Sequence, residues 1–174
     1  IVSCNTLLHF YALGGNAGKA QEFLDEIERD DIFSQARPDE ITFNTVINAY
    51  GNSLQHDAPE KAEHLLHRMV RSDDTAPNPS TKSFNCVIGA WVKSRRPEAA
   101  ECCMKLFELM KNKDSPYDSE PDTVTFNMLI NSLLAAPNAE PDPHRAEEIL
   151  TQMKLRSQSR ESRVAPRNKT YGSM

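Results

Sequence analysis

Four asparagines return along the chain at a nearly constant spacing. The separations are 39, 41 and 42 residues, and the positions are Asn5, Asn44, Asn85 and Asn127. A carboxamide carries a hydrogen-bond donor beside an acceptor, so it can pair with the edge of a uracil or a cytosine. Asparagine is a middling to poor helix former, and a neutral surface choice does not explain one in every copy. The four amides therefore predict a ligand.

Each asparagine lies in a longer motif that repeats. Residues 38–50 return as residues 79–91 and 121–133, and partial copies occupy residues 2–8 and 166–171. Self-similarity with a period of about forty residues is typical of solenoid proteins, in which one small unit stacks on the next. The sequence predicts a single repeat array over residues 1–174. Its units are approximately 1–38, 39–79, 80–121 and 122–166, with the start of a fifth at 167–174.

The motif also carries an apolar stripe at helical spacing. Apolar side chains recur at positions i, i+3, i+4 and i+7, which places them on one face of an amphipathic helix. The four sets are Cys4, Leu7, Leu8, Tyr11; Phe43, Val46, Ile47, Tyr50; Phe84, Val87, Ile88, Trp91; and Phe126, Leu129, Ile130, Leu133. We expect these faces to form the core. The asparagines lie on a different and mostly polar face.

A second helical pattern follows each first one. A small residue precedes apolar residues at +3, +4 and +7, over residues 20–27, 62–69, 103–110 and 146–153. The small residue allows two helix axes to approach closely. Asp39, Ser80 and Asp122 are typical N-cap residues for the first helices, and capping is compatible with a ligand role. Each unit is therefore predicted to be a helical hairpin, and the fold to be all-α.

These motifs resemble a known family. Pro-Asp-x-x-Thr-Phe-Asn-x-x-Ile-Asn followed by Ala-x-x-Leu-Leu-x-x-Met resembles the pentatricopeptide repeat, over nearly the whole chain. The resemblance implies a right-handed α-solenoid superhelix of stacked helix-turn-helix repeats. It also implies binding of single-stranded RNA, one base per repeat. The units here are longer than is usual for the family, because extra residues follow each second helix.

The resemblance further implies a pairwise code. In this family the first-helix asparagine acts with the residue just before the next unit's first helix; Asn with Asp favours uracil, and Asn with Ser favours cytosine. The pairs are Asn5 with Asp39, Asn44 with Ser80, Asn85 with Asp122, and Asn127 with Arg167. The implied preference is U-C-U followed by a pyrimidine, 5′ to 3′ along the chain. Arg167 is outside the usual pairings, so the fourth letter is the weakest.

Two further sets of residues are expected to contact RNA. Residues three positions before each asparagine are placed to sandwich bases, and they are Val2, Ile41, Lys82 and Val124. Stacking on aromatic platforms is worth about 1–3 kcal/mol per base, and these apolar or alkyl side chains should give less. The family often has a lysine near the end of the first helix that meets the RNA backbone. Only Lys93 supplies it here.

The charge balance favours a competing interpretation. The net charge is −5, and an acidic body repels phosphate. A scaffold for protein partners, with a peptide or helix in the groove as in tetratricopeptide solenoids, would also be built from helical hairpins. The inter-unit loops could contact such partners too. The Asn row paired with Asp or Ser favours RNA over this alternative.

No constellation for catalysis is found in the sequence. His64 and His67 lie one turn apart behind Glu60 and Glu63, but a zinc site there is a weaker interpretation than solvated i, i+4 charge pairs. The four cysteines lack metal-ligand spacing and are expected to be reduced. We therefore predict a protein that is not an enzyme, with no metal and no cofactor.

The subcellular location of the protein is implied only by the resemblance. The chain begins at Ile1 and stops just inside a fifth motif, so we expect a segment of a longer protein. No apolar run approaches the length needed to span a bilayer. The resemblance implies a mitochondrion or a chloroplast, and a role in RNA processing, stability or translation.

Overall fold

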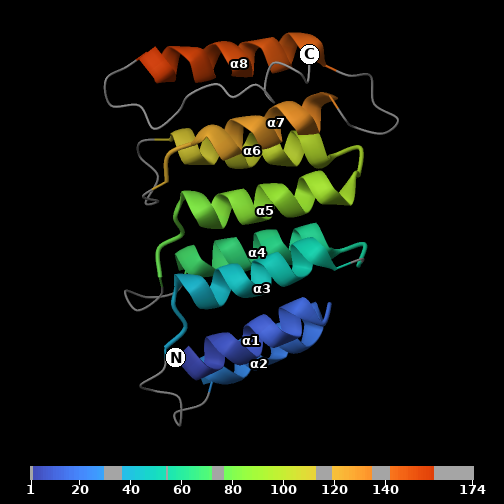
Figure 1. The fold of residues 1–174 in the computed structure, drawn as a ribbon, viewed down its shortest axis with the longest axis vertical. Helices are drawn as coiled ribbons and strands as arrows, with labels where there is room; N and C mark the ends of the chain where they lie inside the picture. Colours follow the sequence, from blue (N-terminus) through green and yellow to red (C-terminus); the bar gives the residue numbers. More distant parts are fainter. Residues whose placement is uncertain are drawn as a thin grey trace.

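The computed structural model describes residues 2–29, 37–53, 55–71, 77–112, 119–134 and 142–158. Within these ranges the chain forms eight helices and no strand. They are α1 (Val2–Leu13), α2 (Ala17–Arg29), α3 (Glu40–Asn52), α4 (Ala58–Arg71), α5 (Thr81–Ser94), α6 (Ala99–Lys111), α7 (Thr123–Leu134) and α8 (Pro143–Gln158). Figure 1 shows them stacked as a ladder of hairpins, from α1 and α2 to α8. The predicted all-α solenoid is confirmed.

The first helices α3, α5 and α7 each begin at an N-cap residue whose side chain bonds to the first turn. Asp39 Oδ1 accepts from Thr42 N at 2.8 Å, while Asp39 N donates to Thr42 Oγ1 at 3.0 Å. Ser80 and Ser83 form the corresponding box on α5. At α7, Asp122 Oδ1 accepts from Thr125 N at 2.9 Å. Each cap satisfies backbone donors that the first turn leaves free, so the predicted capping roles are confirmed.

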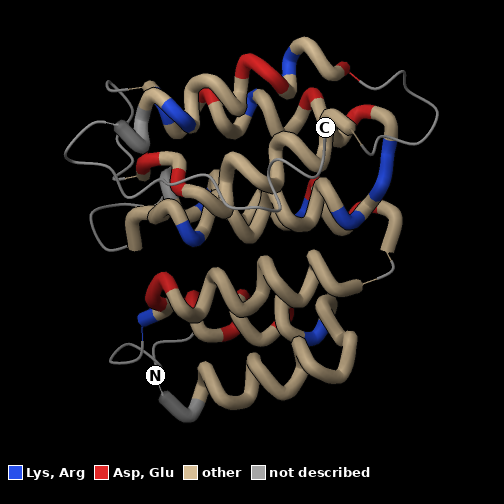
Figure 2. The backbone as a smooth tube through the Cα atoms, turned by 45° about the horizontal axis from the view of Figure 1, so that its top comes forward, with Lys and Arg blue, Asp and Glu red and all other residues tan. Residues whose placement is uncertain are grey.

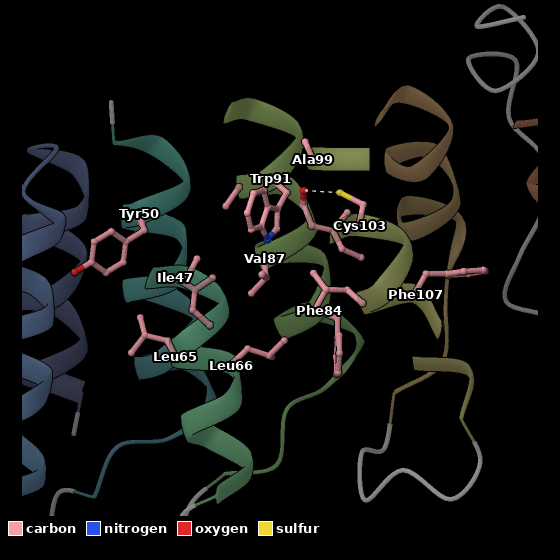
Figure 3. Close-up of a cluster of buried hydrophobic side chains, with 14 of the residues drawn as sticks. Ile47, Tyr50, Leu65, Leu66, Phe84, Val87, Trp91, Ala99, Cys103 and Phe107 are labelled. Atoms are coloured by element: carbon pink, nitrogen blue, oxygen red, sulfur yellow. Dashed lines mark hydrogen bonds between the residues drawn. The ribbon is translucent and has the colours of Figure 1, made fainter. Parts of the chain in front are cut away.

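The core runs through the stack without a break. The apolar stripe of α3, α5 and α7 is buried, with Phe43, Phe84 and Phe126 each 1 % exposed. Figure 3 shows how side chains of successive helices alternate in one cluster, from Ile47 and Tyr50 to Phe107. Each unit therefore buries its apolar face against its neighbours, as solenoid units must.

Cys103 takes the small-residue position of its second helix. Its thiol is fully buried and donates to Ile88 O at 3.8 Å (Figure 3). Burial, the largest effect, raises the pKa of Cys103 to about 12. All four cysteines are free thiols. Cys103 therefore acts as a packing residue.

The first unit departs from the predicted core. Of its stripe only Leu8 is buried, and Leu7 is 37 % exposed, whereas the equivalent Val46, Val87 and Leu129 are fully buried. In the later units the preceding hairpin covers this position, since α3 packs on α1 and α2, and α5 packs on α3 and α4. The expectation that Leu7 belongs to the core was wrong, because among the described residues no hairpin packs on that side of α1. Cys4 and Tyr11 are half-buried and pack against the core from its edge.

Charge is divided unevenly between the two sets of helices. The first helices α1, α3, α5 and α7 carry only Glu40, Lys82 and Lys93, and the other charged helical residues lie on α2, α4, α6 and α8 (Figure 2). Ion pairs connect successive second helices: Arg68 of α4 contacts Asp25 and Glu28 of α2, and Arg96, in the turn before α6, contacts Glu60 of α4. The first helices thus present a nearly uncharged face.

Candidate functional site

The predicted asparagines lie where one unit meets the next. We name three such places by their residues. Junction 1 consists of Asn5, Asp39 and Thr42; junction 2 of Asn44, Glu40, Ser80 and Ser83; and junction 3 of Asn85, Asp122 and Thr125. In each, an amide on one first helix faces the N-terminus of the next first helix. The pairing of Asn127 with Arg167 falls outside the described residues, because residue 167 is not among them.

Junction 1 is a closed ring of hydrogen bonds across two units. Asn5 Nδ2 donates to Asp39 Oδ1 at 3.3 Å, and Thr42 Oγ1 donates to Asn5 Oδ1 at 2.8 Å. Thr42 Oγ1 also accepts from Asp39 N, and its single hydrogen is shared between Asn5 Oδ1 and Asp39 Oδ1, which lies 2.7 Å away. The side chain of Thr42 is fully buried, and Asn5 and Asp39 are half-buried. The amide is thereby fixed in orientation.

Junction 3 repeats this arrangement. Asn85 Nδ2 donates to Asp122 Oδ1 at 3.1 Å, Thr125 Oγ1 donates to Asn85 Oδ1 at 2.7 Å, and Asp122 N donates to Thr125 Oγ1 at 3.1 Å. Thr125 is fully buried, as Thr42 is. Two junctions about eighty residues apart in sequence therefore share the same donors, acceptors and geometry.

Junctions 1 and 3 each leave one donor and one acceptor unused. In junction 1 the second oxygen of Asp39, Oδ2, receives no hydrogen bond from the described residues, and Asn5 Nδ2 keeps a second hydrogen. Burial raises the pKa of Asp39, but hydrogen bonds from Thr42 and Asn5 outweigh it and hold the pKa below its ordinary value. The carboxylate is therefore ionised at neutral pH and accepts only. An amide donor beside a carboxylate acceptor matches the edge of a pyrimidine.

Junction 2 is built differently. Glu40 Oε1 accepts from Asn44 Nδ2 at 3.1 Å and from Ser80 Oγ at 2.5 Å, so the carboxylate bridges the predicted pair. Asn44 is only 4 % exposed, and its Oδ1 is buried without a partner in the described part of the chain. The expectation that every amide of the row is open to solvent was therefore wrong for Asn44, because Glu40 lies against it.

The residues expected to sandwich bases are exposed where the structure describes them. Ile41 is 59 % and Val124 41 % exposed, and Lys82 is also exposed, although each lies on an otherwise packed first helix. The side chain of Val2 lies outside the described part. Lys93 is exposed and donates to Asn52 Oδ1 of the preceding unit at 2.7 Å. Its ammonium keeps further hydrogens for an anion.

Sequence reasoning missed four residues of the junctions. Thr42, Ser83 and Thr125 belong to the recurring Thr/Ser-Phe-Asn triplet, but their hydrogen bonds at the junctions were not foreseen. Thr42 and Thr125 contact the amide of the preceding unit, whereas Ser83 contacts Ser80 of its own unit. Their hydroxyls lie two residues before each asparagine, so the recurrence itself was the available signal. Glu40 gave no such signal, since Thr81 and Thr123 occupy the equivalent positions.

The described ranges contain neither a cluster of metal ligands nor a membrane-spanning helix. No group of three or more histidine, cysteine or acidic side chains is positioned to hold a metal ion there. Nor does any helix in those ranges combine the length and apolar character needed to cross a membrane.

The stacked hairpins and their amide junctions define a helical-hairpin repeat protein. Two family models match the sequence: a pentatricopeptide repeat domain over residues 1–53 and a PPR repeat over residues 41–73. These matches over residues 1–73 and the named relatives support a pentatricopeptide repeat protein.

Curated relatives agree with this family. Three pentatricopeptide repeat-containing proteins of Arabidopsis thaliana are 26%, 25% and 29% identical to the chain over 72%, 74% and 62% of its length. The second of them is named as chloroplastic. The matches cover 19%, 15% and 11% of those relatives, so the chain spans at most about a fifth of their length.

Proposed function

We propose that the chain binds single-stranded RNA, with one base at each junction between units. The observation that carries this proposal is the shared geometry of junctions 1 and 3. In both, an Asn–Asp pair is fixed by a buried threonine and still offers one donor and one acceptor. Fixed polar pairs at regular intervals along one helical face suit the recognition of successive bases.

The proposed sequence preference follows the pairs implied by the family. Asn5 with Asp39 and Asn85 with Asp122 select uracil, because a carboxylate accepts from the ring N–H of uracil. Asn44 with Ser80, considered without Glu40, selects cytosine, and Asn127 with Arg167 a pyrimidine. The preference that follows from the pairs alone is U-C-U-pyrimidine, with the unit bounds given above.

The remaining contacts support bases and backbone. Exposed Ile41, Lys82 and Val124 provide alkyl surfaces between which bases can stack, and Lys93 meets a phosphate. Because the first helices hold only two basic residues, non-specific affinity should be low and the salt dependence shallow. We also propose an organellar site of action, a mitochondrion or a chloroplast, in RNA processing, stability or translation; a fluorescent fusion of the whole protein outside both organelles would refute this.

RNA binding can be tested with strands that differ only in their central letters. Fluorescence anisotropy at low salt should show tighter binding of strands containing UCUC or UUUC than of strands containing AGAG. Asn85→Ala should reduce the difference, whereas Gln152→Ala, a carboxamide change on the second helix α8, should leave it unchanged. Equal affinity for the pyrimidine and purine strands would contradict the proposal.

One observation favours a second function, a scaffold for protein partners. The nearly uncharged face of the first helices, with exposed Ile41 and Val124, would also suit a peptide or a helix. If no RNA strand binds the folded chain at low salt, this alternative replaces the first.

A further inference from the structure

Glu40 is the acidic exception among the first helices. It is the first residue of α3 and the one carboxylate within α1, α3, α5 and α7. Thr81 and Thr123 occupy the same position on α5 and α7. A general preference for acid at the first turn of a helix therefore does not explain it, because α5 and α7 have none there.

Glu40 changes what Ser80 can offer. The hydroxyl of Ser80 has one hydrogen, which it donates to Glu40 Oε1 at 2.5 Å. Its oxygen already accepts from Lys82 N at 3.1 Å as the cap of α5. Ser80 can therefore accept one more hydrogen bond but cannot donate one.

Glu40 is also more accessible to a base than the amide of Asn44, which it covers. Asn44 donates to Glu40 Oε1 and is 4 % exposed, whereas Glu40 is half-buried. The second carboxylate oxygen, Oε2, receives no hydrogen bond from the described residues. A base arriving at junction 2 thus meets a carboxylate acceptor, as it does at Asp39 and Asp122.

We infer that Glu40 determines the base at junction 2 and that this base is uracil. The inference rests on the proposed RNA binding. Uracil N3 carries a hydrogen that a carboxylate accepts. Cytosine N3 carries a lone pair, which would face the oxygen lone pairs of Glu40 and Ser80. All three junctions then select uracil. The cytosine predicted at junction 2 from Asn44 and Ser80 alone is therefore replaced by uracil.

The test compares strands containing UUUC and UCUC, with AGAG as the purine reference. The unaltered chain should bind UUUC roughly tenfold more tightly than UCUC, the size of one matched base contact. Glu40→Thr installs the residue found at positions 81 and 123, frees the Ser80 hydroxyl and uncovers Asn44, so it should reverse the ratio. Glu26→Thr removes an exposed carboxylate from the second helix α2 and should leave the ratio unchanged.

A second variant separates charge from shape. Glu40→Gln keeps an oxygen that can accept from Ser80 and Asn44 but loses the charge, so its ratio should fall between those of the chain and Glu40→Thr. Circular dichroism confirms that each variant is folded. Tighter binding of UCUC by the unaltered chain, or an unchanged ratio in Glu40→Thr, would overturn the inference while RNA binding stands. Failure of both pyrimidine strands to bind more tightly than AGAG would refute the proposed selectivity for pyrimidines, and the inference with it.

Discussion

Junctions 1 and 3 use a buried threonine to hold an Asn–Asp pair. In junction 2 a serine replaces both the aspartate (Ser80) and the threonine (Ser83). Ser83 Oγ accepts from Ser80 N at 3.3 Å but makes no hydrogen bond to Asn44 Oδ1, which stays unpartnered in the described structure. Ser80 is also shorter than an aspartate. Glu40 bridges the resulting gap. The same backbone repeat can therefore present a carboxylate from two different positions.

This difference shows where a pairwise code depends on its surroundings. The hydrogen-bonding character of Ser80 is set by a third residue, since its single hydrogen is taken by Glu40. At junctions 1 and 3 the third residue, Thr42 or Thr125, contacts both the amide oxygen and Oδ1 of the aspartate. The second oxygen of the aspartate, Oδ2, receives no hydrogen bond from the described residues. A base preference assigned from two residues therefore holds only where the third residue makes the same hydrogen bonds to them.

The largest expected loss of stability comes from core substitutions, and it should be similar near junction 2 and near junction 3. Phe84→Ala and Phe126→Ala each remove a side chain that is 1 % exposed, and each should destabilise the chain by about 3–5 kcal/mol through a core cavity. Urea unfolding followed by circular dichroism measures both. Val124→Ala, at an exposed position on α7, is the matched control and should cost far less.

A large difference between the losses of unfolding free energy in Phe84→Ala and Phe126→Ala would contradict the comparison of the junctions drawn above. It would mean that the junctions differ in core packing as well as in hydrogen bonding. Comparable losses would confine the difference to the polar residues.

A smaller effect should separate the two kinds of junction. Thr125→Val leaves Asn85 Oδ1 and Asp122 N without their partner in a buried site, and it should cost about 1–3 kcal/mol. Ser83→Ala removes one longer bond and should cost about 0.5–1 kcal/mol. Urea unfolding of both variants checks the order, and a larger loss in Ser83→Ala would contradict the account of junction 2.

The smallest expected effect is a pH dependence at junction 1. The pKa of Asp39 lies below its ordinary value of 3.8 in the folded chain, so its carboxylate stabilises the fold above that value. The stabilisation is lost as the pH falls through the folded pKa. The difference in unfolding free energy between the chain and Asp39→Asn should therefore shrink between about pH 5 and pH 3.

Asn5→Ala provides the internal control for this titration. It keeps the carboxylate but removes one of the hydrogen bonds that lower its pKa, so the loss between the two pH values should be smaller. A difference between the chain and Asp39→Asn that stays constant down to pH 3 would show that the ring does not favour the ionised form.

Sequence periodicity was enough to predict the hairpins and the core of the later units. Phe43, Val87 and Leu129 are buried as expected, because one apolar face per helix has only its neighbours to pack on. The caps at Asp39 and Ser80 were also predictable from residue type. The pattern failed at Leu7, whose burial depends on a hairpin packed against α1 and not on its own helix.

The polar junctions were only partly predictable. The sequence paired Asn5 with Asp39 by family resemblance, and the structure places them in contact. It could not predict that a hydroxyl from Thr42 fixes the amide or that Glu40 accepts from Ser80, because such contacts depend on side-chain reach across units. The asparagine row therefore located the site, and the third residues determine its chemistry.

The most direct test of base contact at the junctions is NMR of the side-chain amides during titration with RNA. On addition of a strand containing UUUC, the NH₂ resonances of Asn5 and Asn85 should shift and saturate together, while those of Gln21 and Gln152 on second helices stay in place. A strand containing AGAG should leave all four unchanged. Shifts confined to the second helices, or equal shifts with both strands, would contradict the account.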